Sequence, residues 1–221
     1  MREIVLDTET TGLDPAVGHR VIEIACIELV HHIPTDRDFH CYVNPGRDIP
    51  ADAHAVHGLS EEFLAAYPPF EAVVDELFAF IGADPLVIHN AEFDIAFLNA
   101  ELARIGRPTL TLSHIDTLTM ARQRFPGAPA SLDALCRRFE IDNSDRTSHG
   151  ARIDCALLAA VYLELIGGRQ PALDFVAPQM AVVSAVRIHR PARPHAPLAE
   201  ELAAHAEMLS LITAPLWRAE V

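Results

Sequence analysis

The sequence contains no lysine: all 17 basic residues of this 221-residue chain are arginines. It therefore has neither the phosphate-binding lysine of a P-loop nor a lysine that could form a Schiff base, and both classes of enzyme are excluded. Cysteine is also scarce, and Cys26, Cys41, Cys136 and Cys155 form no C-x-x-C pair. This spacing suits a reduced cytoplasm and predicts neither a disulfide framework nor a zinc site.

Long hydrophobic runs and positive charge are lacking too. No apolar run reaches the roughly 18–20 residues needed to cross a bilayer, so no membrane association is expected. The N-terminus is charged and enters a predicted strand at once, which indicates no signal peptide. The formal net charge is −14 at pH 7. A broad basic face for nucleic acid is therefore not expected, and a polyanionic substrate would be held locally, by a metal or a partner.

The N-terminal part of the chain predicts three strands. Residues 3–7 and 21–30 are rich in buried-strand residues, and 38–43 would pair with 21–30 after a turn at Pro34–Asp36. Three consecutive strands with short connections suggest an antiparallel meander.

Helical patterns dominate the next part of the chain and alternate with two short strands. Strands first and helix–strand alternation afterwards predict an α/β fold, with a mixed sheet and helices on both faces. The predicted helices are 60–67, 70–82, 91–106, 131–139 and 150–168, and the predicted strands are 85–90 and 112–117.

The composition changes after Gly167–Gly168. Residues 176–197 contain four prolines, three arginines and no acid, which is typical of a linker. The helical pattern that follows is too short to fold alone, so we expect it to dock on another surface. The predicted organisation is a globular domain at 1–168, a linker at 169–197 and a docking segment at 198–221.

Two acids end the first strand. Asp7 and Glu9 are two residues apart, so both side chains should point to the same face of the sheet. Two like charges about 4 Å apart repel by about 4 kcal/mol at an effective dielectric near 20, unless protons or cations intervene. Ligands that are all oxygen favour hard cations such as Mg²⁺ or Mn²⁺. The alternative is a solvated strand end without a metal.

Two further acids begin the apolar stripes of predicted helices. Asp94 precedes Phe97 and Leu98 on one stripe, and Asp154 precedes Leu157 and Leu158 on another. Such positions are costly for a carboxylate unless it is paired or binds a metal. For each of these two acids alone, the alternative is that it caps its helix or interacts favourably with the positive end of the helix dipole. Four acids at strand ends and helix starts together favour a metal site.

A histidine lies close to the last of these acids in the sequence. His149 precedes Gly150, which predicts a loop immediately before the helix that carries Asp154. From there the imidazole could lean over a metal site and take a proton from water near neutral pH. The alternative is a polar surface residue.

Three motifs resemble those of the DEDD exonuclease superfamily in its H-x4-D subtype: "DTETTG", "HNAEFDIAFL" and "HGARID". They occur in order and span residues 3–166. More narrowly, "VHGLS", "SLDALCRRFEIDNSDRTSHGA" and "VYLELIGG" resemble the family of proofreading epsilon subunits of bacterial DNA polymerase III. The segments "EELAAHAEML" and "LWRA" resemble the C-terminal segment with which that family docks on the polymerase subunit.

The resemblance implies a ribonuclease H-like fold, with a mixed five-stranded sheet flanked by helices on both faces. It implies a metal-dependent 3′–5′ exonuclease that releases nucleoside 5′-monophosphates from single-stranded or mispaired DNA 3′ ends. Two divalent cations, Mg²⁺ or Mn²⁺, would act together, with His149 as the general base. Their ligands would be Asp7, Glu9, Asp94 and Asp154.

The resemblance also implies contacts to the terminal nucleotide. Asp52 stands where the family has a glutamate and is shorter by one methylene, which puts that contact in question. For His57 and Asn90 a loop-stabilising hydrogen bond is the alternative, and Asp116, at the end of a strand, is expected to be structural. The implied nucleotide contacts are Thr8, Thr10, Gly12, Leu13, Asp52, His57 and Asn90.

Two protein partners are implied as well. The polymerase (alpha) subunit of DNA polymerase III would bind residues 198–221. The sequence "QPALDF" at 170–175 matches the Q-x-x-L-x-F pattern with which bacterial proteins bind the sliding clamp, using Gln170, Leu173 and Phe175.

Three other functions remain open from the sequence. "DTET" resembles the start of haloacid-dehalogenase phosphatases, although these use a downstream lysine that is absent here. A polymerase adaptor whose nuclease has decayed and an RNA-trimming exonuclease of the same superfamily are the other two.

Overall fold

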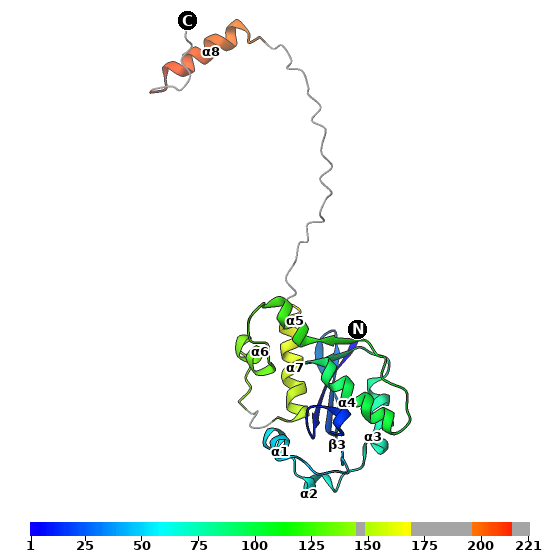
Figure 1. Ribbon diagram of the computed structural model, residues 1–221. Coiled ribbons are helices and arrows are strands. Elements are labelled where there is room, and N and C mark those ends of the chain that lie inside the picture. The colour runs from blue at the N-terminus through cyan, green and yellow to red at the C-terminus, as the bar shows by residue number, and fades with distance from the viewer. Residues whose placement is uncertain (145–148, 169–195, 214–221) are drawn as a thin grey trace. The chain divides into compact units, whose positions relative to one another are not determined.

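The computed structural model describes residues 1–144, 149–168 and 196–213 (Figure 1). The chain divides into two units, Met1–Asp174 and Phe175–Val221.

Five strands of the first unit form one mixed sheet in the order β3-β2-β1-β4-β5. β1 is antiparallel to β2, and β2 to β3, whereas β4 is parallel to both β1 and β5. Because parallel neighbours end at the same edge of a sheet, the C-terminal ends of β1 and β4 lie together. The strands are β1 (Arg2–Thr10), β2 (Val21–Val30), β3 (Ile33–Tyr42), β4 (Leu86–Ile88) and β5 (His114–Asp116).

Helices cover both faces of this sheet (Figure 1). Ile4 and Leu6 of β1 belong to the apolar cluster on one face, whereas Val5 belongs to the cluster on the other face. This alternation is the two-residue period of a strand, and it confirms the predicted layers. α3 (Phe70–Ile81) and α4 (Ala91–Arg104) cover the first face, and α5 (Thr117–Arg124), α6 (Leu132–Arg138) and α7 (Ala151–Leu165) cover the second.

The predicted turn at Pro34–Asp36 is wrong, because these residues belong to β3. The chain reverses earlier, at His31 and His32, whose φ angles are 53° and 66°. Positive φ at both central residues matches the twist of the two flanking strands. Pro34 is tolerated because β3 is an edge strand, which forms a ladder on one side only.

Two helices of the structure were not predicted from the sequence. α1 (Ala51–His57) buries only its last residue, so it has no apolar stripe to detect. α5 buries Thr117 and Ala121 and begins where a strand was predicted. A third helix, α2 (Glu61–Leu64), is shorter than predicted, although Ser60 caps it as expected by accepting from Phe63 N over 3.2 Å.

The described part of the second unit contains one helix, α8 (Ala199–Ser210), where the sequence predicted it. Its apolar side chains are exposed; Leu202 and Met208, for example, are 54% and 49% exposed. No helix within residues 1–144, 149–168 and 196–213 is long and apolar enough to cross a membrane.

Candidate active site

β1 presents the first two predicted ligands on one face. Asp7 and Glu9 alternate with the buried Thr8 and lie opposite Ala25 and Glu23 of β2. The expectation that both acids share a face is therefore confirmed. This is also the face against which α7 packs.

Asp94 reaches the same edge from the first turn of α4. Thr8 Oγ1 donates a 2.7 Å hydrogen bond to Asp94 Oδ1, and Asp94 is only 3% exposed. Asn90 makes the sharp step from β4 into α4 with φ 68°, a left-handed conformation that asparagine tolerates. Its backbone N–H donates to Asp116 Oδ1 over 3.0 Å. The structure thus gives Asn90 a backbone role.

The first turn of α7 brings in Asp154, which is 4% exposed. Its backbone N–H donates to Gly150 O over 3.0 Å, and its Oδ2 lies 3.4 Å from His149 Nδ1. His149 precedes the helix as predicted, and its backbone N–H donates to Val56 O of α1 over 3.1 Å. One ligand atom from each of Glu9, His149 and Asp154 lies within 4.8 Å of the others.

The carboxylates affect one another's ionisation. Burial raises the pKa of Asp7 well above its usual value, and the charges of Asp94, Glu9 and Asp154 raise it further. Burial likewise raises the pKa of Asp94 to about 7, although bonds from Thr8 oppose that rise. Metal-free, the cluster therefore holds protons that exposed carboxyl groups would release. A donor set made of carboxylate oxygens, which holds protons in this way, fits hard divalent cations.

A cavity of about 250 Å³ opens onto this cluster. Asp7, His149 and Asp154 line it, together with His89 and Asp133, which the sequence analysis missed. His89 follows β4 directly, so its polar position at a strand end was the available signal. Its Nδ1 lies 3.0 Å from Thr117 Oγ1, and burial lowers its pKa. Asp133 follows the capping residue Ser131 and gave no such signal.

The end of β1 and the loop after it carry three predicted nucleotide contacts. Thr10 Oγ1, at the end of β1, donates to Gly12 O of the loop over 2.7 Å. A Cβ atom on Gly12 would lie 2.3 Å from the His19 ring, so any larger residue there would have to displace that ring. Leu13 is 85% exposed and, with Asn90 and Phe93, lines a second hollow of about 320 Å³.

α1 carries the other two predicted contacts. Asp52 is exposed in its first turn, whereas His57 at its end is 5% exposed. His57 Nδ1 accepts from Leu59 N over 3.0 Å, and burial lowers the pKa of the ring. Its Nε2 is buried without a hydrogen-bond partner among the described residues.

Three other predictions have different outcomes. Asp116 is structural as expected: it caps α5 by accepting from Leu118 N over 3.0 Å. Burial alone would raise its pKa, but hydrogen bonds from Thr119, Asn90, Leu118 and Ala91 lower it below the usual value. The clamp-binding prediction at 170–175 and most of the linker at 169–197 lie outside the described residues.

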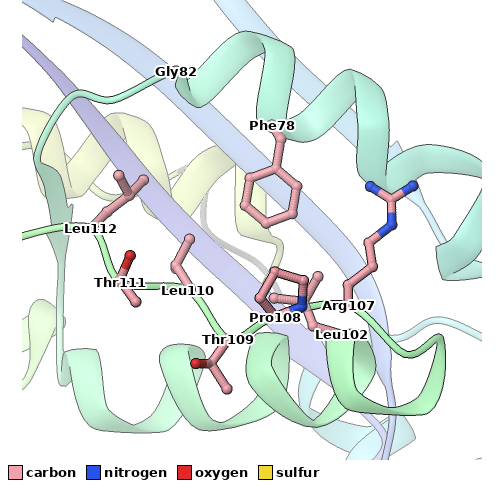
Figure 2. Close-up of a pocket in the computed structure, with 9 residues that line it drawn as sticks. All are labelled: Phe78, Gly82, Leu102, Arg107, Pro108, Thr109, Leu110, Thr111 and Leu112. Carbon is pink, nitrogen blue, oxygen red and sulfur yellow. The ribbon is translucent and has the colours of Figure 1, made fainter.

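A further hollow, of about 310 Å³, lies away from these acids (Figure 2). Phe78 of α3 reaches into it toward Pro108 and Leu110 of the loop after α4. Of its lining residues only Arg107 is charged, and Arg107 is paired with Asp75. Since it contains none of the predicted ligands, it is not the candidate active site.

The sequence matches a known family and is similar to individual proteins of known name. Residues 4–162 match the exonuclease family RNase T. DNA polymerase III subunit epsilon of Rickettsia felis is 54% identical over 180 residues, covering 80% of this chain and 79% of that protein. The subunit of the same name from Salmonella typhimurium is 43% identical over 238 aligned positions, covering 99% of this chain and 98% of that protein.

Solved structures show the same architecture. Exonuclease X in complex with 5′ overhanging duplex DNA is 26% identical and has a TM-score of 0.60, over 74% of this chain and 90% of that chain. The nuclease domain of 3′hExo, a DEDDh family member bound to rAMP, has a TM-score of 0.64, over 75% of this chain and 91% of that chain. At 16% identity, the second likeness supports the fold alone.

Proposed function

Since this chain belongs to the exonuclease family, within the group of DNA polymerase III epsilon subunits, we propose that it is the proofreading 3′–5′ exonuclease of a bacterial replicative polymerase. The reaction is metal-dependent hydrolysis of the terminal phosphodiester at a single-stranded or mispaired DNA 3′ end, and its product is a nucleoside 5′-monophosphate. Family membership removes the phosphatase alternative. With this role in replication, the proposed location is the bacterial cytoplasm.

The observation that carries this proposal is the convergence of acids from three distant segments. Asp7 and Glu9 come from β1, Asp94 from α4 and Asp154 from α7, and their charges act on one another. Keeping such a cluster partly buried costs stability unless cations neutralise it. The presence of all four acids with His149 also argues against an adaptor that has lost its nuclease.

We assign Asp7, Glu9, Asp94 and Asp154 as the ligands of two divalent cations, Mg²⁺ or Mn²⁺. When bound, these ions would activate water and stabilise the charge that develops on the phosphodiester. The assignment is supported by the oxygen-only donor set and by the raised pKa values of Asp7 and Asp94. Thr8 supports the site by holding Asp94.

His149 is the proposed general base, which takes the proton of the attacking water. Its side chain is 47% exposed, so water and substrate can reach it, and Asp154 lies beside its Nδ1. The bond from His149 N to Val56 O fixes its backbone against α1. The same bond ties the proposed base to the helix that ends in His57.

The terminal nucleotide is proposed to lie between the loop after β1 and α1. Leu13 is exposed enough to wedge beside a base, and the Nε2 of His57 is a buried polar atom that a substrate could satisfy. Asp52 is exposed but short, so its contact is the least supported. The remaining proposed contacts are Thr8, Thr10, Gly12 and Asn90.

Partners are proposed to deliver the DNA. A net charge of −14 disfavours strong binding to DNA by this chain alone. A mispaired end is cheaper to melt than a paired one, so a site that accepts only a single strand selects mismatches. The exposed apolar side chains of α8 support docking of 198–221 on the polymerase alpha subunit, and 170–175 is the proposed clamp-binding motif. The proposed domain boundaries at 168 and 197 rest on the change in composition along the sequence.

The experiment that tests this function compares two labelled substrates. The purified protein is given Mg²⁺ or Mn²⁺ with a 3′-labelled DNA single strand or its RNA counterpart, and mononucleotide release is measured. We expect release from DNA with either metal and none with EDTA. Faster release from RNA would instead assign an RNA-trimming exonuclease, and no release from either substrate would refute the proposal.

A further inference from the structure

A fifth carboxylate, Glu23, lies beside the proposed metal ligands without being one of them. It stands opposite Glu9 in the β1–β2 pairing and is 3% exposed. Its Oε1 lies 2.7 Å from His40 Nε2, and its Oε2 accepts from Ala151 N over 3.3 Å. Glu23 therefore bridges β3 and the first residue of α7.

α7 needs such an acceptor at its start. The first N–H groups of a helix have no partner within the helix, and a side chain at the N-cap usually satisfies one of them. The N-cap of α7 is Gly150, which has no side chain, and Ala151 is fully buried, so water cannot replace the missing cap. Glu23 supplies the acceptor from a strand 128 residues away in the sequence.

What Glu23 holds is the segment that carries two proposed functional groups. His149 lies two residues before Ala151, and Asp154 lies three residues after it in the same turn. The backbone N–H of Asp154 donates to Gly150 O, so the cap and the ligand share one turn of backbone. A shift of Ala151 would therefore move both groups.

The neighbouring ties to the sheet hold the same turn less directly. Cys155 Sγ donates to Ala25 O over 3.3 Å, and the exposed Arg152 pairs with Asp38 over 3.1 Å. Glu23 differs from Cys155 and Arg152 in placing a negative charge close enough to Asp7 to affect its ionisation. Burial is the main reason that the pKa of Asp7 is raised, and Glu23 adds a small part. Because a buried glutamate at this position is repelled by the acidic cluster, a stabilising contact is needed to offset that repulsion.

We propose that Glu23, oriented by His40, is a positioning residue that fixes the start of α7 and thereby places His149 and Asp154 for catalysis. This inference rests on the proposed exonuclease function. In this role Glu23 acts as a hydrogen-bond acceptor whose side chain is long enough to meet Ala151 N. The negative charge of Glu23 has no part in catalysis. Neutral glutamine should therefore replace it, whereas aspartate should not.

The chain offers a matched control at the other end of α7. Glu3 is also fully buried; its Oε1 accepts from Tyr162 Oη over 2.8 Å, and its Oε2 lies 2.6 Å from His32 Nδ1. It thus repeats the arrangement of a buried glutamate between α7 and a histidine of the β2–β3 hairpin. Because Tyr162 is far from Asp154 along the helix, Glu3 should affect how α7 docks without affecting the site.

The test compares Glu23→Gln, Glu23→Asp, Glu3→Gln and Glu3→Asp with the wild-type full chain. kcat and KM for release from a 3′-labelled DNA single strand in Mg²⁺ are measured with the melting temperature. Amide hydrogen exchange is followed in the peptide that covers 149–155. Glu23→Asp shortens the reach by one C–C bond, about 1.5 Å, and should break the bond to Ala151.

We expect Glu23→Asp to lower kcat by about 10–100-fold, as for residues that orient metal ligands, with little change in KM and faster exchange at 149–155. Glu23→Gln and both Glu3 variants should retain most of the wild-type kcat. The inference is overturned if Glu23→Asp keeps the wild-type kcat. It is also overturned if Glu23→Gln or Glu3→Asp loses as much kcat as Glu23→Asp does. Absence of nucleotide release by the wild type would instead refute the proposed function.

Discussion

Thr8 Oγ1 donates a 2.7 Å hydrogen bond to Asp94 Oδ1 and so joins β1 to α4 across 86 residues of sequence. Both side chains are buried. Burial raises the pKa of Asp94, and the bond from Thr8 opposes that rise by stabilising the ionised form. The hydroxyl of Thr8 is thus engaged with a proposed ligand, whatever contact Thr8 makes with a nucleotide.

Thr8→Val removes this donor while nearly keeping the shape of the side chain. A hydrogen bond to a charged group is worth about 1.5–3 kcal/mol, and about 1.4 kcal/mol corresponds to a factor of ten. The Mg²⁺ concentration for half-maximal activity should therefore rise by about tenfold or more. Thr8→Ser keeps the hydroxyl and should behave like the wild type. An unchanged Mg²⁺ requirement in Thr8→Val would contradict this role.

The raised pKa of Asp94 predicts how the metal-free protein responds to pH. Between the usual carboxyl pKa near 3.9 and about 7, the folded state holds a proton that the unfolded state releases. Stability therefore falls as pH rises through this window. Asp94→Asn removes the titrating group, so in EDTA the melting temperature of the wild type should fall more steeply from pH 5 to pH 8 than that of the variant.

The raised pKa of Asp94 sets the size of the expected difference in melting temperature. One pKa unit corresponds to about 1.4 kcal/mol, and 1 kcal/mol shifts Tm by about 2–4 °C in a domain of this size. A difference of at least about 3 °C across the window is expected. Asp75→Asn should leave the slope unchanged, because Arg107 holds the pKa of Asp75 below its usual value, outside the window. Equal slopes for the wild type and Asp94→Asn would argue against the raised pKa.

His149→Ala should lower kcat by about 10²–10⁴-fold, the range for loss of a general base. Mn²⁺ binding should be kept, because the four carboxylates remain. His114→Ala removes an exposed histidine outside the site and should change neither property. Full turnover by His149→Ala near pH 7 would exclude it as the base.

The exposed face of α8 predicts separable binding and catalysis. Leu202→Glu places a charge on a side chain that is 54% exposed, so it should not unfold the helix. It should weaken co-elution with the polymerase alpha subunit on gel filtration and leave single-strand trimming unchanged. Glu207→Gln, also exposed, is the control and should keep the complex. Unaltered co-elution of Leu202→Glu would contradict docking through this face.

Much of the fold could be predicted because the signals were local. The β2 strand follows from its β-branched residues, and the stripe of Val73, Val74 and Leu77 predicts α3. Pro34 led to the wrong prediction of a turn, because a proline can lie in β3 only as long as β3 is an edge strand. That position is a property of the whole sheet and cannot be read from the local sequence. α1 had no apolar period, since only its last residue is buried.

The candidate site divides in the same way. Asp7, Glu9, Asp94 and Asp154 stand out because acids interrupt apolar patterns at strand ends and helix starts. Glu23 also lies within an apolar strand, but its purpose depends on Ala151, 128 residues later. Asp133 gave no signal, because only the fold brings α6 to the cavity. Long-range contacts of this kind cannot be obtained from the spacing of one segment.

The most direct test of the acidic cluster is mononucleotide release by the Asp7→Ala/Asp154→Ala double variant. These positions come from β1 and α7, and Asp7→Ala or Asp154→Ala alone should already nearly abolish release if the two acids share one site. With Mg²⁺ and a 3′-labelled DNA single strand, the wild type should release nucleotides and the folded double variant almost none. Release by the purified double variant at a rate near that of the wild type would contradict the account.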